Sequence, residues 1–137
     1  MVKVNFFNKI GNILYEGNFI NNKREGKGKY YYENGDYYDG EFKNDLRNGK
    51  GIEYYKNKKV KYDGDFFNDE YDGNGKYYME NGEYYIGQFK NGLKDGKGIE
   101  YYQNGNKKYE GEFKDNKYCG KGKLYKENGE LERDGNF

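Results

Sequence analysis

The sequence predicts an all-β fold, an elongated, twisted single-layer antiparallel meander in which each strand pairs with its chain neighbour. Three observations predict it. A motif of an aromatic residue, any residue, glycine, any residue and phenylalanine recurs at spacings of 23 and 24 residues. A Gly-x-Gly begins nine residues after each motif glycine. Short turn signals, Asn-Gly above all, separate the two and suit hairpin loops.

The aromatic motif sets the organisation of the chain. It begins at Tyr15, Tyr38, Tyr62, Tyr85 and Tyr109, with a degenerate copy, RDGNF, at Arg133. A longer period of 47 residues lies over it, because GKYYYENGDYYDGEF from Gly28 resembles GKYYMENGEYYIGQF from Gly75. We therefore expect an N-terminal capping strand in residues 1–14 and a repeat array in residues 15–137. The array holds about five full repeats and a C-terminal half repeat.

The turns after phenylalanine predict the pairing inside each repeat. Pairs such as Asn44-Asp45 tolerate the left-handed region that a two-residue hairpin turn requires. A turn there places Gly40 opposite Gly49, Tyr38 opposite Gly51, and Phe42 opposite Arg47.

The Asn-Gly turns predict the pairing between repeats. A three-residue loop at Glu33-Asn34-Gly35, closed by a G1 bulge, places Gly28 opposite Gly40 and Tyr30 opposite Tyr38. In the 24-residue spacing, a four-residue loop from Gln103 to Asn106, or a two-residue Asn104-Gly105 turn, places Gly98 opposite Gly111. In either case the loop absorbs the extra residue, so the motif rings stay on one face.

On that face an aromatic ring on one strand lies over the bare glycine backbone of the next strand. A one-layer sheet needs such a device, or a partner, to bury apolar surface. The rings either pack on the sheet itself or receive a partner, and the two roles are compatible. The candidate partner-binding rings are Tyr15, Phe19, Tyr38, Phe42, Tyr62, Phe66, Tyr85, Phe89, Tyr109 and Phe113. The glycines expected to be structural are Gly17, Gly28, Gly40, Gly49, Gly51, Gly64, Gly75, Gly87, Gly98 and Gly111.

The opposite face carries charged residues and one tyrosine three positions after each Gly-x-Gly. These tyrosines recur on every second strand, roughly 10 Å apart. They either cover the sheet backbone or form a ladder of exposed rings for a ligand. This second candidate surface consists of Tyr31, Tyr54, Tyr78, Tyr101 and Tyr125.

Composition excludes several classes of site. The chain has no Ser, Thr or His, so neither a hydroxyl triad nor a Cys–His dyad can form. The single cysteine, Cys119, excludes an internal disulfide and a cysteine-rich zinc site. Lys and Arg number 25 against 24 Asp and Glu, and this balance gives no electrostatic case for nucleic-acid binding, which calls for a basic stripe or patch. The segment from Asp69 lacks the ligand spacing of a calcium loop. We expect no enzyme, no catalytic residue, no metal site and no cofactor.

The Y-x-G-x-F motif, the G-x-G nine residues later and the YxxENGD that follows closely resemble the MORN repeat (membrane occupation and recognition nexus), over about residues 14–137. The family often has Trp where this chain has phenylalanine, and its following glycine survives only as Gly92. The resemblance implies an elongated, twisted sheet that serves as an adaptor or scaffold. Family members bind partner proteins, often a helix along the aromatic groove. Some associate with membranes or the cytoskeleton, dimerise or bind phospholipid.

These inferences predict a non-enzymatic adaptor or scaffold that holds a protein segment, expected to be helical, on its aromatic and glycine face. The alternatives are a membrane-surface or phosphoinositide-binding module and a self-associating rod. Expected partners are a protein, anionic lipid, and a second copy through the C-terminal edge at residues 130–137, but not nucleic acid. We expect an intracellular, cytoplasmic location with membrane or cytoskeletal association. MVKVNFF lacks a signal-peptide pattern, and no apolar run approaches the ~20 residues of a membrane span.

Overall fold

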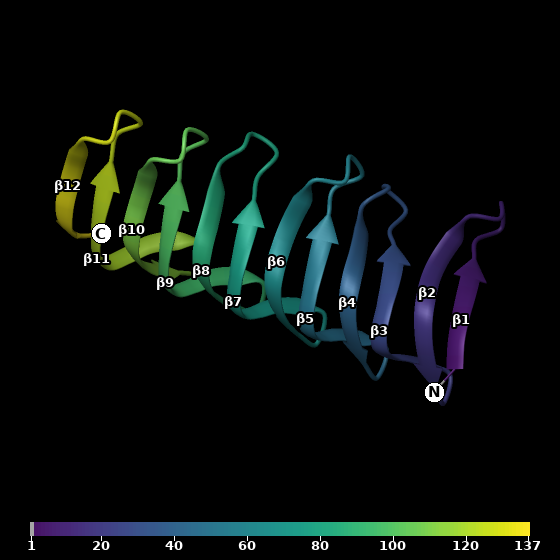
Figure 1. Cartoon of the computed structure of the whole chain (residues 1–137). Helices are drawn as coiled ribbons and strands as arrows, with labels where there is room; N and C mark the ends of the chain where they lie inside the picture. The colour runs from purple at the N-terminus through teal and green to yellow at the C-terminus, as the bar shows by residue number, and fades with distance from the viewer. Residues whose placement is uncertain (1) are drawn as a thin grey trace. The chain divides into compact units, whose positions relative to one another are not determined.

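The computed structural model describes residues 2–137, which form twelve β-strands and no helix (Figure 1). The chain divides into two compact units, Met1–Glu70 and Tyr71–Phe137. The strands of the first unit are β1 (Val2–Phe7), β2 (Ile13–Ile20), β3 (Lys23–Tyr31), β4 (Tyr37–Lys43), β5 (Leu46–Tyr54) and β6 (Val60–Phe67). The remaining strands are β7 (Glu70–Tyr78), β8 (Tyr84–Lys90), β9 (Leu93–Tyr101), β10 (Lys107–Lys114), β11 (Lys117–Tyr125) and β12 (Leu131–Asn136).

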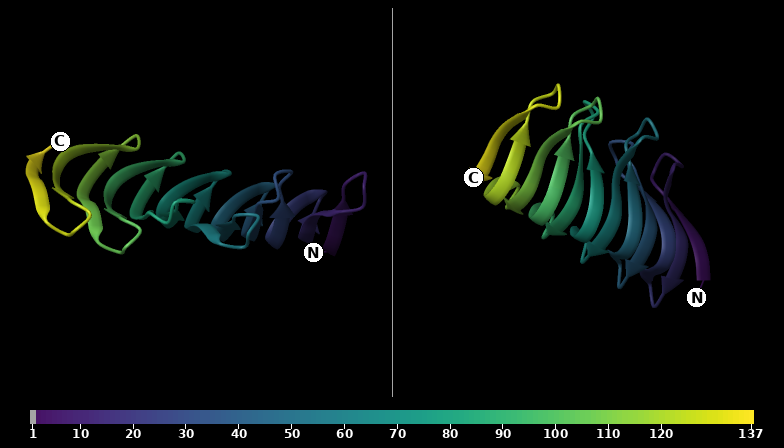
Figure 2. Two further views of the ribbon diagram at one scale, coloured as in Figure 1. Left: turned by 90° about the horizontal axis from the view of Figure 1, so that it is seen from above. Right: turned by 60° about the vertical axis from the view of Figure 1, so that its left-hand side comes forward.

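Within each unit the strands follow one another in chain order as an antiparallel meander. Both units consist of one layer of curved strands (Figure 2). The predicted all-β meander is therefore confirmed for each unit. The predicted division into a capping strand, residues 1–14, and an array stays a prediction, although β1 does pair with the first motif strand.

The turns between repeats follow the predicted three-residue geometry. Gly35 N–H donates to the Tyr32 carbonyl at 3.0 Å, Tyr32 N–H donates to the Asp36 carbonyl at 2.9 Å, and Gly35 has φ +96°. This is a type I turn closed by a G1 bulge. The predicted pairs of Gly28 with Gly40 and of Tyr30 with Tyr38 are confirmed.

The loop in the 24-residue spacing differs from both predicted forms. Tyr102 N–H donates to Asn106 at 2.8 Å and Gly105 N–H donates to Tyr102 at 2.9 Å, so this is again a three-residue loop. The extra residue is Lys108, which bulges out of β10 between two paired neighbours. Lys61 bulges out of β6 in the same way. The predicted pair of Gly98 with Gly111 is confirmed, but the strand rather than the loop absorbs the extra residue.

The pairing inside a repeat also needs a correction. The Asn44-Asp45 turn is present, with φ of 48° and 73°, and Phe42 lies opposite Arg47 as predicted. Gly40, however, pairs with Gly51 instead of Gly49, and Tyr38 pairs with Glu53 instead of Gly51.

A bulge in β5 causes this shift, because residues 48–50 lie opposite the single residue Glu41. The Glu41 carboxylate accepts a hydrogen bond of 2.6 Å from the Lys50 backbone N–H. Gly49 has φ +98° at this point, a conformation that disfavours L side chains. Gly49 is therefore a bulge residue and stands outside the row of paired glycines.

Candidate functional site

The motif rings form one face of each unit, which we call the tyrosine–glycine face. Nine of the ten candidate rings are at most 6% exposed, and Phe19 is half-buried. The Tyr38 ring lies directly over Gly51, where an added Cβ would come within 2.3 Å of the ring. Tyr85 covers Gly98 in the same way. The predicted arrangement of rings over bare glycine backbone is thus present.

Each motif tyrosine also binds its own strand. The hydroxyl donates to the carbonyl oxygen three residues ahead, at 2.7–3.0 Å, in Tyr15, Tyr38, Tyr62, Tyr85 and Tyr109. In the degenerate copy, the Arg133 guanidinium replaces the tyrosine, because it donates to the Asn136 carbonyl and lies 4.1 Å from the Phe137 ring centroid. Burial raises the pKa of Tyr38 and of Tyr85 above the usual value near 10. These rings are neutral hydrogen-bond donors.

Side chains six positions apart on one strand close over these rings. In a straight strand such residues stand about 20 Å apart. Arg47 and Glu53 nevertheless form an ion pair of 3.3 Å, and Lys94 and Glu100 form one of 3.1 Å, because β5 and β9 bend around the tyrosines. The equivalent pairs in other repeats are the cation–π contact of Arg24 with Tyr30 and the ring contact of Tyr71 with Tyr77.

These closing pairs were not singled out from the sequence. Their signal is the 23- and 24-residue recurrence of a cationic or aromatic residue at 24, 47, 71, 94 and 118. They explain how a one-layer unit buries its own core. The partner-binding role of the ten rings stays a prediction, but their burial leaves almost no ring surface for direct contact.

The charged face lies opposite, and it holds the second candidate surface. In the first unit Tyr37 stacks on Tyr54 with centroids 4.7 Å apart, and Tyr31 makes a tilted contact with Tyr37 at 5.7 Å. In the second unit the stack contains Tyr78, Tyr84 and Tyr101, with centroids 5.7 and 4.6 Å apart. All six rings are half-buried.

Tyr37 and Tyr84 were missing from the predicted surface. The predicted three-residue loop places Tyr37 opposite Tyr31, and directly opposed residues share a face of the sheet. The predicted pairing was therefore enough to include Tyr37, and Tyr84 by the same argument. Tyr125 lies opposite Leu131, outside the stack of the second unit.

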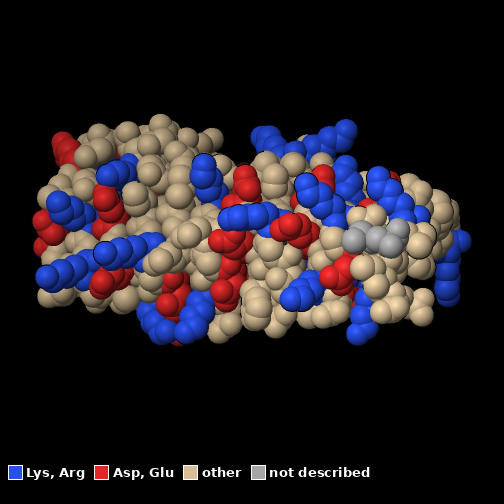
Figure 3. Space-filling view, turned by 60° about the horizontal axis from the view of Figure 1, so that its bottom comes forward, with Lys and Arg blue, Asp and Glu red and all other residues tan. Residues whose placement is uncertain are grey.

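Beside the row of glycines, charge alternates from strand to strand on this face. Towards the turns the alternation ends, since Lys107 on β10 lies opposite Tyr101 and Lys114 of β10 pairs with Asp95 of β9. The basic residues lie on odd-numbered strands, Lys3, Lys27, Lys29 and Lys50 in the first unit and Lys76, Lys97, Lys121 and Lys123 in the second. The acidic residues lie on even-numbered strands, Glu16, Asp39, Glu41, Asp63 and Asp65, then Glu110, Glu112 and Asp134. Figure 3 likewise shows Lys and Arg atoms interspersed with Asp and Glu atoms. Neither sign forms a continuous patch.

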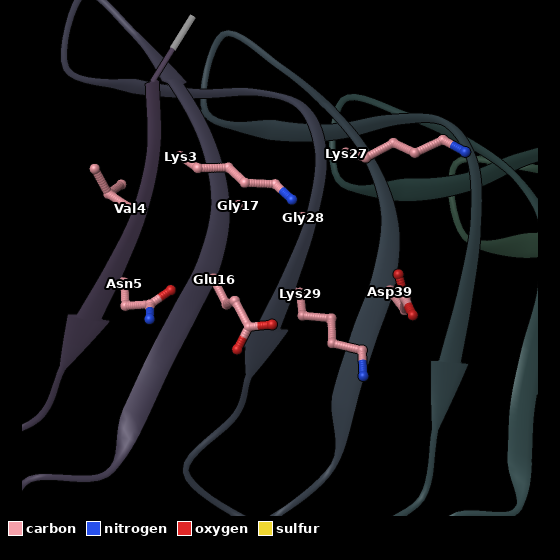
Figure 4. Close-up of a pocket in the computed structure, with 9 residues that line it drawn as sticks. All are labelled: Lys3, Val4, Asn5, Glu16, Gly17, Lys27, Gly28, Lys29 and Asp39. Carbon is pink, nitrogen blue, oxygen red and sulfur yellow. The ribbon is translucent and has the colours of Figure 1, made fainter.

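A groove follows the row of glycines on the charged face of each unit. In the first unit it measures about 730 Å³, and charged side chains of neighbouring strands flank Gly17 and Gly28 (Figure 4). In the second unit it measures about 520 Å³, with Gly98 and Gly111 on its floor. Only this second groove has two isoleucines in its wall, Ile86 and Ile99.

The bulged lysines belong to the turn ends of the sheet. Lys108 Nζ forms an ion pair of 2.8 Å with Glu83 and lies 5.4 Å from the Tyr102 ring centroid. The hydrogen bond from Lys108 lowers the pKa of Glu83. Lys61 contacts Asp36 at 3.5 Å in the first unit. These pairs hold the loops and bring no reactive groups together.

The part of the chain that the structure describes contains no cluster of His, Cys, Asp or Glu suited to a metal ion. None of its segments is a helix that could span a membrane. A search of curated proteins found no match. The MORN repeat matches the chain five times, at residues 15–37, 38–60, 62–84, 85–107 and 109–130. These matches cover most of the sequence and coincide with the observed strand pairs, so the chain belongs to the MORN-repeat family.

Proposed function

We propose that the protein is an adaptor without enzymatic activity, and that it binds a protein segment on the charged face of its second unit. MORN repeats are in general modules for interaction with proteins or membranes, and they are generally non-enzymatic. One observation favours the charged face of the second unit as the binding surface. Ile86 and Ile99 lie beside the tyrosine stack and form a wall of the groove in the second unit.

The apolar patch has a defined shape. Ile86 lies directly opposite Ile99, and Tyr84 lies directly opposite Tyr101, so four apolar side chains form a square on β8 and β9. All four are partly exposed. An apolar patch with a polar rim is typical of a protein interaction site.

An amphipathic helix fits this square. Neighbouring strands lie about 4.8 Å apart, and a helix rises about 5.4 Å per turn. A helix laid across the strands therefore presents apolar residues at i and i+3 or i+4 to successive strands. Basic residues one or two turns further along would face Glu110 on β10.

The tyrosine–glycine face supports the proposal less well. Its motif tyrosines are at most 2% exposed, and the closing pairs lie over them. A segment bound there would contact mainly Arg47, Lys94 and their neighbours, whose side chains already bond within the sheet.

The test uses a partner recovered by pulldown with the intact chain and then produced alone. We expect Ile86→Ser with Ile99→Ser to weaken its binding at least tenfold in calorimetry, since two buried apolar contacts are lost. Ile52→Ser is the matched control, because Ile52 holds the position of Ile99 in the first unit. Unchanged affinity of the double variant would place the segment elsewhere.

Lipid binding is the other candidate and is tested with the same protein. We expect no flotation with anionic liposomes at physiological salt, because acidic and basic strands alternate on the charged face. Flotation that fades as salt rises would instead support a membrane-surface role.

A further inference from the structure

We propose that the charged face of the first unit pairs with the same face of a second copy, with basic strands of one copy over acidic strands of the other. This surface is separate from the segment-binding patch of the second unit. The inference therefore does not depend on the proposed function.

Alternation by strand makes the face complementary to itself. A two-fold axis parallel to the strands, above the gap between β3 and β4, places β3 over β4, β2 over β5 and β1 over β6 of the second copy. Each odd strand then faces an even one. A two-fold axis above a strand would instead place odd strands over odd strands and even strands over even ones. Like charges would then face each other, so only axes above a gap between strands are compatible with the charges.

The facing residues agree with this register. Across the axis, Lys27 faces Glu41, Lys29 faces Asp39, and Lys3 faces Asp65 of the second copy. Lys27 is exposed and makes no ion pair within the part of the chain that the structure describes. Between the charged side chains, a groove over Gly17 and Gly28 leaves room for side chains of a second sheet (Figure 4).

An apolar row borders the charges at the turn end of the strands. The same axis places Tyr31 over Tyr37 and Phe7 over Val60 of the second copy. Phe7 is 57% exposed in the single chain. At the turn end, apolar side chains thus meet apolar side chains, whereas the same register sets Glu16 of one copy over Ile52 of the other. Aligned packing of two sheets is a common arrangement.

The size of the surface predicts a weak dimer. The patch spans six strands that lie about 4.8 Å apart, and about four residues along each strand at a rise of about 3.3 Å per residue. Its backbone therefore measures roughly 24 by 13 Å. Side chains enlarge this patch, but it stays below the ~800 Å² per partner of a standard interface. We expect association that depends on protein concentration and weakens as salt rises.

The test measures molar mass by light scattering and by sedimentation over a concentration series. The intact chain should shift towards twice its monomer mass. Lys29→Glu alone and Asp39→Lys alone should each remain monomeric, because like charges then meet across the axis. Lys123→Glu is the matched control in the second unit, where Lys123 holds the position of Lys29 beside an acidic strand, and it should still dimerise.

Mixing separates association from misfolding. In a mixture of Lys29→Glu and Asp39→Lys, the two substituted side chains carry opposite charges and face each other across the axis. The unchanged Asp39 of the first variant likewise faces the unchanged Lys29 of the second, so a heterodimer should form although neither variant dimerises alone. A monomeric parent at every concentration, or no heterodimer from two folded variants, would overturn the proposal. So would a dimer that withstands both variants but is lost on Leu131→Lys, since that result identifies the C-terminal edge.

Discussion

The hydroxyl of Tyr38 donates a 2.7 Å hydrogen bond to the carbonyl oxygen of Glu41, three residues further along the same strand. In a straight strand this carbonyl would lie about 10 Å from the Tyr38 backbone. The tyrosine therefore lies along its own strand, over Gly40 and across Gly51. A single side chain both fills the glycine row and holds the bend of β4.

The first prediction removes this hydrogen bond alone. Tyr38→Phe should lower the free energy of unfolding by about 1–2 kcal/mol, because the half-buried Glu41 carbonyl loses its donor while the ring stays. Urea denaturation followed by circular dichroism measures the change. Tyr31→Phe is the control on the charged face, with an expected cost near zero. Equal costs for the two variants would contradict the structural role of the hydroxyl.

The second prediction concerns the glycine under the ring. Gly51→Ala should destabilise the fold by about 1–3 kcal/mol, the range for overpacking, because its Cβ would lie 2.3 Å from the Tyr38 ring. All three nearest atoms belong to Tyr38. Gly51→Ala should therefore cost much less in a Tyr38→Leu background. A double-mutant cycle measures this coupling, and additive costs would show that the ring is not the cause.

Much of the fold followed from the sequence for a simple reason. A strand has a side-chain period of two, so one repeated motif and one loop length determine which residues share a face. The pair of Gly28 with Gly40 was predicted on this basis and is present. The left-handed Asn44-Asp45 turn was predicted from the tolerance of Asn and Asp for positive φ, and it is present as well.

The bulges could not be predicted in the same way. Residues 48–50 shift the register because the Glu41 carboxylate binds the Lys50 backbone N–H, which is a tertiary contact without a period of its own. The closing pair of Arg47 and Glu53 depends on the bend that this bulge permits. That bend, rather than the motif, buries the candidate rings. For this reason the proposed binding patch lies on the charged face.

The third prediction tests the bulge in β10. Deletion of Lys108 converts the 24-residue spacing into the 23-residue one, so the pairs of the neighbouring strands should persist. We expect a folded protein with a loss of about 1 kcal/mol, since the partly exposed ion pair with Glu83 is removed. Deletion of Glu110 instead moves the side chains on one side of the deletion to the opposite face of the sheet. This change should unfold β10. Hydrogen exchange of the β10 amides distinguishes the two deletions, and equal protection in both would contradict the bulge.

The fourth prediction exchanges one closing pair for another that the chain already contains. Glu100→Gln should cost about 3 kcal/mol, because Lys94 then loses its buried partner. Lys94→Tyr with Glu100→Tyr copies the Tyr71–Tyr77 pair of the neighbouring repeat. The double variant should be within about 1 kcal/mol of the parent in denaturant titrations, since well-packed apolar groups replace buried ion pairs without loss. A double variant less stable than Glu100→Gln would show that the ion pair itself is required.

The fifth prediction is a loss of stability at alkaline pH. Burial raises the pKa of Tyr38, Tyr85 and Tyr109 in the folded state, whereas the unfolded phenols ionise near pH 10. Above pH ~10 the unfolded chain releases protons that the folded chain retains, so the free energy of unfolding falls as pH rises. The stabilisation is complete below pH ~10 and is lost towards the higher pKa of the folded state.

Urea midpoints over a pH series, together with phenolate absorbance, measure this loss. Lysines paired with carboxylates, such as Lys108, act in the same direction, so the pH dependence of the parent alone does not identify the tyrosines. Tyr38→Phe isolates one of them, because it removes a single titrating group and should reduce the slope above pH ~10 by up to one proton. If Tyr38→Phe left the slope unchanged, burial under the closing pairs would not be what keeps Tyr38 protonated.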